Sequence, residues 1–151
     1  MKNNLENVSM RDAFFEKLYD LARNDSDIVV LSADQGAPAL DKFRKDLSGQ
    51  FFNTGIAEQN TILAGAGLAI EGKKVFAHAI ANFITLRCYE QIRIVLAAMK
   101  IPLTLVGVGA GFSYDDSGPT HHAVEDLSIL RILPNLVIHN ASDSRMASAF
   151  A

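Results

Sequence analysis

The chain has 151 residues, a net charge of −3, 49% hydrophobic residues and 21% charged residues. That length and balance fit one globular domain over residues 1–151 with a substantial hydrophobic core, and they exclude an intrinsically disordered chain. The basic clusters are short, so composition gives no electrostatic case for nucleic acid or an anionic membrane as partner.

Targeting signals are not evident in the sequence. The first ten residues, MKNNLENVSM, lack the apolar core of a signal peptide, and the longest uncharged stretch, 101–114, is too short and glycine-rich to span a bilayer. Cys88 is the single cysteine, which excludes an internal disulfide and fits a reducing compartment. The sequence therefore predicts a cytoplasmic protein with no membrane partner.

Apolar runs of strand length alternate with longer periodic segments along the chain. The first helix is expected over 9–23 with Ser9 as its cap, followed by a buried strand over 28–33 and a short extra strand near Phe51. The later elements are expected as helix 57–70, strand 74–80, helix 82–100, strand 102–109, helix 123–133, strand 135–140 and a last helix capped by Ser142. This alternation predicts an α/β domain with a mostly parallel sheet and helices on both faces.

The loops that leave the strand ends carry the candidate functional side chains. In parallel sheets ligands bind beyond the carboxyl ends of the strands, and this is where Asp34, Glu58, Phe83, His121 and His122 fall. Loop-borne carboxylates and histidines are candidates for binding or catalysis. Glu58 also has a simpler explanation, because a carboxylate in the first turn of a helix is favoured by the helix dipole. The residues alone predict a strand-end pocket that contains Glu and His.

Other motifs fail on context. The glycines of GAGLAIEG (65–72) sit inside a predicted helix, where close packing is the favoured explanation, and neither they nor GVGAG (107–111) form a dinucleotide fingerprint. His121 and His122 have no Cys or His partner at ligand spacing, so no metal site is predicted within this chain. Cys88 lies within a predicted helix and is expected in the core.

Four segments together carry a family resemblance. LSAD (31–34), FFNTGIAEQN (51–60), ANF (81–83) and GPTHHAVEDLSILRILPNL (118–136) resemble, in the same order, the pyrimidine-binding domain of the transketolase family of thiamine diphosphate enzymes. The resemblance covers most of the chain from Ser9 onward. It implies the fold of that domain and thiamine diphosphate as cofactor.

The resemblance gives Glu58 a chemical role. The matching family carboxylate hydrogen-bonds a ring nitrogen of the aminopyrimidine and favours its imino tautomer. The imino nitrogen then removes the proton from the neighbouring thiazolium carbon, and the cofactor stores the electrons of the broken carbon–carbon bond. The resemblance thus implies that Glu58 is both catalytic and cofactor-binding, and that Gln in its place would nearly abolish activity.

Further cofactor contacts follow from the same match. Phe83 corresponds to the aromatic residue on which the pyrimidine stacks. Family members often carry another aromatic residue three positions later, where this chain has Leu86, and Tyr89 aligns with it only to within one position. Asp34 matches an acidic residue near the cofactor and the subunit contact.

The substrate side of the site is implied less completely. His121 matches the histidine that faces the reacting carbons, where it would hydrogen-bond and transfer protons, and His122 follows it. Sugar-phosphate transketolases usually carry Asp directly before Gly-Pro-Thr-His, whereas this chain has Ser117 there and Asp116 one residue earlier. His121, His122, Ser117 and Asp116 are the expected substrate-binding residues, and the substrate is not necessarily a standard pentose phosphate.

The resemblance also implies a missing partner. In the family, another domain with a Gly-Asp-Gly motif holds the diphosphate and Mg²⁺, and this sequence contains no Gly-Asp-Gly. A partner subunit that carries this domain is therefore expected, in a homodimer or heterotetramer. The third transketolase domain is also missing after Ala151, so the sequence is expected to be part of something longer.

The resulting hypothesis is the pyrimidine-binding part of a split transketolase, which transfers a two-carbon ketol unit between sugar-type substrates. One alternative is a component of the deoxyxylulose-phosphate synthase or 2-oxo acid dehydrogenase type. An alternative of another class is a non-catalytic scaffold or regulatory domain.

Overall fold

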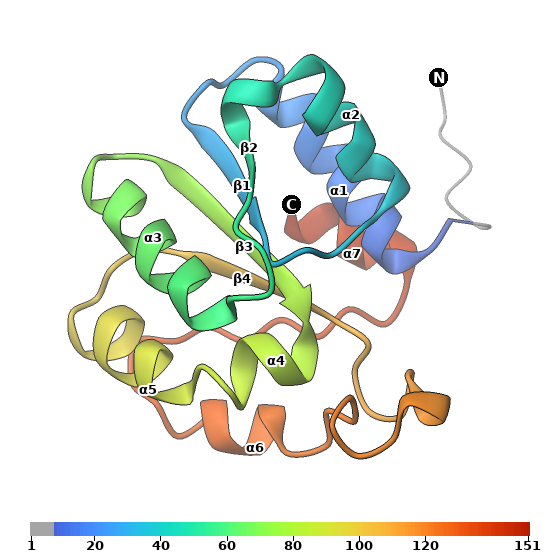
Figure 1. Cartoon of the computed structure of the whole chain (residues 1–151), viewed down its shortest axis with the longest axis vertical. Coiled ribbons are helices and arrows are strands. Elements are labelled where there is room, and N and C mark those ends of the chain that lie inside the picture. Colours follow the sequence, from blue (N-terminus) through green and yellow to red (C-terminus); the bar gives the residue numbers. More distant parts are fainter. Residues whose placement is uncertain (1–7) are drawn as a thin grey trace.

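Four parallel strands form the centre of the computed structural model, which describes residues 8–151 (Figure 1). They lie in the order β2-β1-β3-β4, with the following bounds: β1 Ile28–Ser32, β2 Phe51–Asn53, β3 Lys74–Ile80 and β4 Thr104–Val108. Every residue of β1 is buried because this strand is covered on both faces, as its run of β-branched residues predicts. The predicted α/β class and the short strand near Phe51 are both confirmed.

Helices cover both faces of the sheet (Figure 1). One face carries α1 (Met10–Ala22), α2 (Pro38–Asp46) and α7 (Ser144–Phe150). The other carries α3 (Glu58–Ile70), α4 (Ala81–Thr85) and α5 (Tyr89–Gln91). Within residues 8–151, no helix is both long and apolar enough to cross a bilayer.

The caps of the first and last helices differ in how well they were predicted. Ser9 caps α1 as expected, because its hydroxyl accepts a hydrogen bond from the Asp12 N–H at 3.1 Å. The cap of α7 is Asp143 rather than Ser142, since the Asp143 carboxylate accepts from the Met146 N–H at 2.8 Å. Ser and Asp are both favourable capping residues, so the residue type alone does not show which of Ser142 and Asp143 caps the helix.

The predicted helix over 82–100 is wrong as a single unit. It is divided into α4, α5 and η3 (Ile92–Ala98), and η3 has π-helical geometry. The Thr85 hydroxyl donates to the Ala81 carbonyl and the Cys88 thiol donates to the Phe83 carbonyl, so side chains take part of the helical hydrogen bonding at the break.

The segment after β4 also departs from the prediction. The expected helix over 123–133 is reduced to α6 (Asp126–Leu130), and the expected strand over 135–140 has no strand hydrogen bonds in the described structure. Asn135 adopts a left-handed conformation (φ 62°) and its side chain donates to the Ala97 carbonyl. Leu136 packs against the helical core on the α3 face, so this apolar run does not join the sheet.

The helix α2 was not predicted. It begins at Pro38, which suits the first helical position, but Ala37 before it makes no side-chain cap hydrogen bond. Leu40 and Phe43 are its fully buried large side chains. Ala39, Leu40 and Phe43 do recur at helical spacing, so the sequence carries a signal for this short helix that the prediction did not use.

A glycine sets the distance between α3 and the sheet. A Cβ atom on Gly65 would lie 2.5 Å from Leu103 Cδ1, 3.2 Å from Leu31 Cδ1 and 3.3 Å from Val75 Cγ1. A Cβ atom on Gly67, two residues later in the same helix, would have no other atom within 4 Å. Gly65 is thus required for close packing, which confirms the packing explanation at this position but not at Gly67.

Candidate active site

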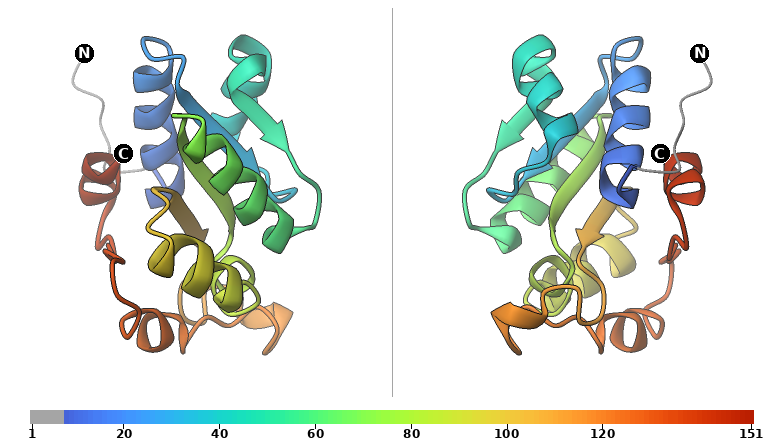
Figure 2. Two further views of the ribbon diagram at one scale, coloured as in Figure 1. Left: turned by 90° about the vertical axis from the view of Figure 1, so that its left-hand side faces the viewer. Right: turned by 90° about the vertical axis from the view of Figure 1, so that its right-hand side faces the viewer.

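Three of the predicted site residues gather at the carboxyl end of the sheet. Glu58 follows β2, Phe83 follows β3 and His121 follows β4. Figure 2 shows α4, the loop after β4 and α6 at one end of the molecule, where β3 and β4 also end. The placement agrees with the rule for parallel sheets.

Glu58 is the first residue of α3, and its side chain is only 3% exposed. The helix dipole favours a carboxylate at this position. A carboxylate that serves only a helix start is ordinarily solvated, because burying a charge is costly unless it is paired. The burial therefore indicates that Glu58 has a role beyond the start of the helix.

The partner of Glu58 is Arg87, which was not among the predicted site residues. Arg87 Nη1 donates to Glu58 Oε2 at 2.9 Å, and Arg87 Cζ lies 4.4 Å from the centre of the Phe83 ring. Arg87 sits in the break between α4 and α5. The Gln59 side-chain amide donates to the Arg87 carbonyl at 3.2 Å and ties the break to α3.

Phe83 also contacts His121. The two ring centres are 4.9 Å apart at an interplanar angle of 64°, which is an edge-on contact. His121 Nδ1 lies 3.1 Å from the Thr120 hydroxyl, and the Asn82 amide donates to the Thr120 carbonyl at 2.6 Å. Glu58, Arg87, Phe83 and His121 thus form a continuous chain of contacts.

The remaining predicted residues lie around this chain of contacts without joining it. Asp34 follows β1 in a left-handed conformation (φ 56°) and accepts a hydrogen bond from the Asn53 amide at 2.8 Å. Tyr89 begins α5 and is half-buried, and among residues 8–151 it makes no ring contact with Phe83 or His121. Neither residue contacts Glu58 in the described part of the chain, so their roles in the site stay predictions.

The loop after β4 holds the other expected substrate-binding residues. His122 packs edge-on against Phe112 with ring centres 4.8 Å apart, and its Nε2 atom is buried with no hydrogen-bond partner in the described part of the chain. Asp116 and Ser117 lie in the exposed turn η4 (Asp115–Ser117). Tyr114 approaches His121 with ring centres 6.0 Å apart, a contact that no sequence pattern predicted.

Cys88 is a core residue, as predicted. It is fully buried, and burial together with the nearby Glu58 carboxylate raises the pKa of its thiol to about 12. A thiol with this pKa remains protonated at neutral pH and is a poor nucleophile. Among the described residues, no group of three His, Cys, Asp or Glu side chains is arranged to hold a metal ion.

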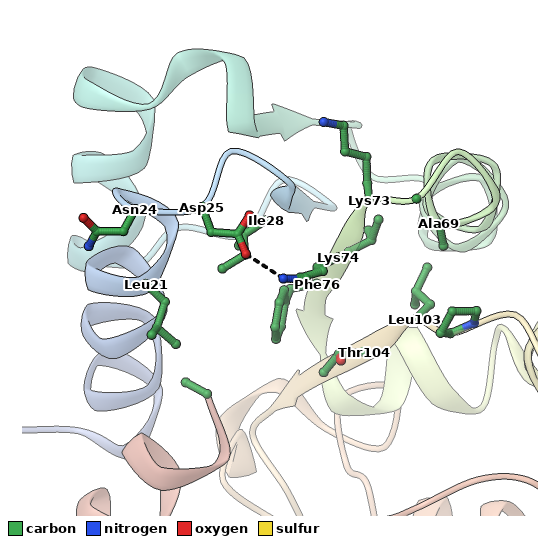
Figure 3. Close-up of a pocket in the computed structure, with 14 residues that line it drawn as sticks. Leu21, Asn24, Asp25, Ile28, Ala69, Lys73, Lys74, Phe76, Leu103 and Thr104 are labelled. Atoms are coloured by element: carbon green, nitrogen blue, oxygen red, sulfur yellow. Dashed lines mark hydrogen bonds and ion pairs between the residues drawn. The ribbon is translucent and has the colours of Figure 1, made fainter.

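A hollow of about 780 Å³ lies at the opposite, amino-terminal end of the sheet (Figure 3). Its two lysines are already paired, Lys74 with Asp25 at 2.7 Å and Lys73 with Asp27 at 2.8 Å. The hollow contains none of the predicted site residues. The carboxyl end of the sheet is therefore the stronger candidate.

The arrangement of Glu58 and Phe83 suits the pyrimidine half of thiamine diphosphate. A buried carboxylate faces a position next to an aromatic ring, and in this structure a flat, nitrogen-rich guanidinium lies in that position. An aminopyrimidine is likewise flat and presents ring nitrogens at its edge. The contacts that hold the guanidinium are those that such a ring needs, a hydrogen bond to the carboxylate and a stacking face.

Comparisons with known proteins find relatives that match most of this chain. The chain is 39% identical over 146 residues to a subunit of the apulose-4-phosphate transketolase of Phocaeicola vulgatus, a match that covers 96% of this chain and 46% of the relative. It is 38% identical over 133 residues to 1-deoxy-D-xylulose-5-phosphate synthase of Aquifex aeolicus, a match that covers 87% of this chain and 21% of the relative.

A solved structure is also similar. It is a split-gene transketolase in the form of an "inactive beta4 tetramer", with 34% identity, a TM-score of 0.83, and coverage of 95% of this chain and 46% of that chain. The chain spans less than half the length of these relatives. The family model of the transketolase pyrimidine-binding domain matches residues 6–150. The chain therefore belongs to the family of transketolase pyrimidine-binding domains.

Proposed function

We propose that this chain provides the pyrimidine side of the active site in a split, thiamine diphosphate-dependent transketolase. It would transfer a two-carbon ketol unit between sugar-type substrates. The observation that carries the proposal is the buried Glu58 carboxylate next to the stacking face of Phe83. When bound, the cofactor supplies the electron sink that carbon–carbon bond cleavage needs.

Each residue of the site has a proposed role. Glu58 holds and shares a proton at the pyrimidine nitrogen, and its 3% exposure keeps water away from that proton. Phe83 supports the flat face of the ring. His121, edge-on to Phe83, moves protons at the substrate's oxygen atoms. Asp34 and Tyr89 have outer roles in cofactor binding.

The substrate would enter along the loop after β4. His122 lies beside His121, and its unpaired buried Nε2 atom is available for a substrate oxygen. Asp116 and Ser117 are exposed in the same loop and would contact the donor's hydroxyl groups. Ser117 in place of the usual Asp supports a substrate that differs from the common pentose phosphates.

A partner subunit is part of the proposal. The sequence has no Gly-Asp-Gly motif, so the diphosphate and Mg²⁺ would be held by another chain in a homodimeric or heterotetrameric assembly. The similar split-gene transketolase is named as inactive in its beta-only tetramer, which supports such a requirement here. Assembly with this partner would take place in the cytoplasm.

The proposal is tested by purification from the native source and assay of what is recovered. We expect a companion chain that carries Gly-Asp-Gly, and cleavage of a ketose without release of CO₂. Recovery of the chain without such a companion would contradict the split enzyme. A scaffold role would be favoured if Glu58→Ala left the activity of the assembled complex unchanged.

A second candidate is a reaction of the deoxyxylulose-phosphate synthase type, which the relative from Aquifex aeolicus supports. The same complex distinguishes the two. Consumption of pyruvate with release of CO₂ would favour this candidate, whereas ketose cleavage without CO₂ favours a transketolase.

A further inference from the structure

Arg87 occupies a break in the helical segment beside the candidate cofactor site. The residues 86–88 separate α4 from α5, and the Arg87 side chain is 46% exposed while its partner Glu58 is 3% exposed. Among residues 8–151, Glu58 is the only carboxylate within ion-pair distance of Arg87. The guanidinium also lies over the Phe83 ring, with Cζ 4.4 Å from the ring centre.

These two contacts have a common physical reason. A buried carboxylate without a partner is costly, so Glu58 needs a donor whenever the site holds no ligand. A guanidinium suits the position because it is planar, always charged, weakly hydrated and able to stack on an aromatic face while it donates hydrogen bonds. Arg87 meets both requirements at once.

The proposed aminopyrimidine would need the same carboxylate and the same aromatic face. Two flat groups cannot both lie on this face of Phe83 and hydrogen-bond with the same Glu58 carboxyl group. Arg87 is half-exposed, so its guanidinium can turn from the site into water without burial of a charge. Its backbone is held by the Gln59 amide and by the turn at 86–88, so only the side chain has to move.

We propose that Arg87 is a placeholder that satisfies Glu58 in the free chain and leaves when the pyrimidine ring arrives. This inference rests on the proposed function, since it assumes that Glu58 and Phe83 receive that ring. It adds a feature that the proposed function does not contain: the chain keeps its own buried carboxylate paired until the cofactor site is completed. Binding of the cofactor must then break the Arg87–Glu58 ion pair.

The cost of this exchange appears in the affinity for the cofactor. A half-exposed ion pair contributes modestly to stability. Because the wild type must break this pair to bind the cofactor, its affinity should be roughly three- to tenfold lower than that of a chain without the arginine. Arg87→Met removes the charge and the stacking plane. Arg87→Lys keeps the charge but loses the plane, so it should bind the cofactor with an affinity between those of Arg87→Met and the wild type.

The test is the dissociation constant of thiamine diphosphate, measured by calorimetry with MgCl₂ on the complex of this chain with its diphosphate-binding subunit. Arg93→Met is the matched control, because Arg93 is on the same helical segment and pairs with Glu90 on the surface. Size-exclusion chromatography and circular dichroism verify that each variant assembles and folds. We expect Arg87→Met to bind roughly three- to tenfold more tightly and Arg93→Met to bind like the wild type.

The variants separate failure of the placeholder from failure of the proposed function. If Arg87→Met or Arg87→Lys binds more weakly than the wild type, or if neither changes the affinity, the placeholder is overturned. The proposed function survives that result when the wild type binds the cofactor and Glu58→Gln is nearly inactive. If the wild type binds no cofactor, the proposed function is wrong and the placeholder falls with it.

Discussion

The packing of α3 on the sheet gives a prediction with its own matched control. Gly65→Ala would place a Cβ atom 2.5 Å from Leu103 Cδ1 and within 3.3 Å of both Leu31 and Val75. Gly67→Ala adds the same methyl group to the same helix with no atom within 4 Å. The two substitutions therefore share the gain in helix propensity and differ in the clash.

The expected magnitudes follow from these distances. Replacement of a helical glycine by alanine contributes about 1 kcal/mol to stability, so Gly67→Ala should raise the free energy of unfolding by about that amount. Overpacking costs about 1–3 kcal/mol, so Gly65→Ala should be less stable than Gly67→Ala by about 1–3 kcal/mol. The end of the Leu103 side chain can move, but Leu31 and Val75 also crowd the position, which limits the relief.

Urea unfolding followed by far-ultraviolet circular dichroism measures both variants, since the chain contains no tryptophan for fluorescence. Gly65→Ala should unfold at a lower urea concentration than Gly67→Ala with a similar slope. Equal stability of the two variants, or a more stable Gly65→Ala, would show that α3 is not packed too closely on the sheet to accept a methyl group at position 65.

Three other predictions concern the site and the core. Glu58→Gln should change the free energy of unfolding by no more than about 1 kcal/mol in urea unfolding, because loss of the pair with Arg87 is offset by removal of a buried charge; a loss of several kcal/mol would contradict this. Phe83→Ala should weaken the binding of thiamine diphosphate to the assembled complex by roughly two- to tenfold in calorimetry, from loss of stacking, and an unchanged affinity would remove Phe83 from the cofactor site. Burial lowers the pKa of His78 from 6.5 to about 4. The folded state therefore favours the neutral imidazole, and the stability that this gives is complete above pH 6.5 and is lost as the pH falls towards 4. The free energy of unfolding should fall by about 3 kcal/mol over this range. Urea midpoints measured across this range should fall in the wild type and fall less in His78→Gln, and equal slopes would show that His78 is not responsible.

The sequence predicted the sheet and the site where local signals agreed with the fold. The run at 28–33 is β-branched and became a strand buried on both faces. Glu58, Phe83 and His121 each follow a strand, and parallel topology brings such positions to one edge. Knowledge of which segments form strands was sufficient to place these three side chains together.

The sequence did not predict features that depend on contacts between distant segments. Arg87 is 29 residues from Glu58, and inside a predicted amphipathic helix an arginine is expected to face water. Its pairing became evident only after the helix was found to break at 86–88. The apolar run at 135–140 was mistaken for a strand, because periodicity alone does not show whether a neighbouring strand edge is within reach.

The proposed activation of thiamine diphosphate by the Glu58 carboxylate can be measured by deuterium exchange at the thiazolium C2 position. The exchange would be followed by rapid quench and NMR in the complex with the diphosphate-binding subunit, for wild type and Glu58→Gln at saturating cofactor. We expect rapid exchange in the wild type and exchange slower by about a hundredfold or more in Glu58→Gln. Equal exchange rates in the two proteins would contradict it.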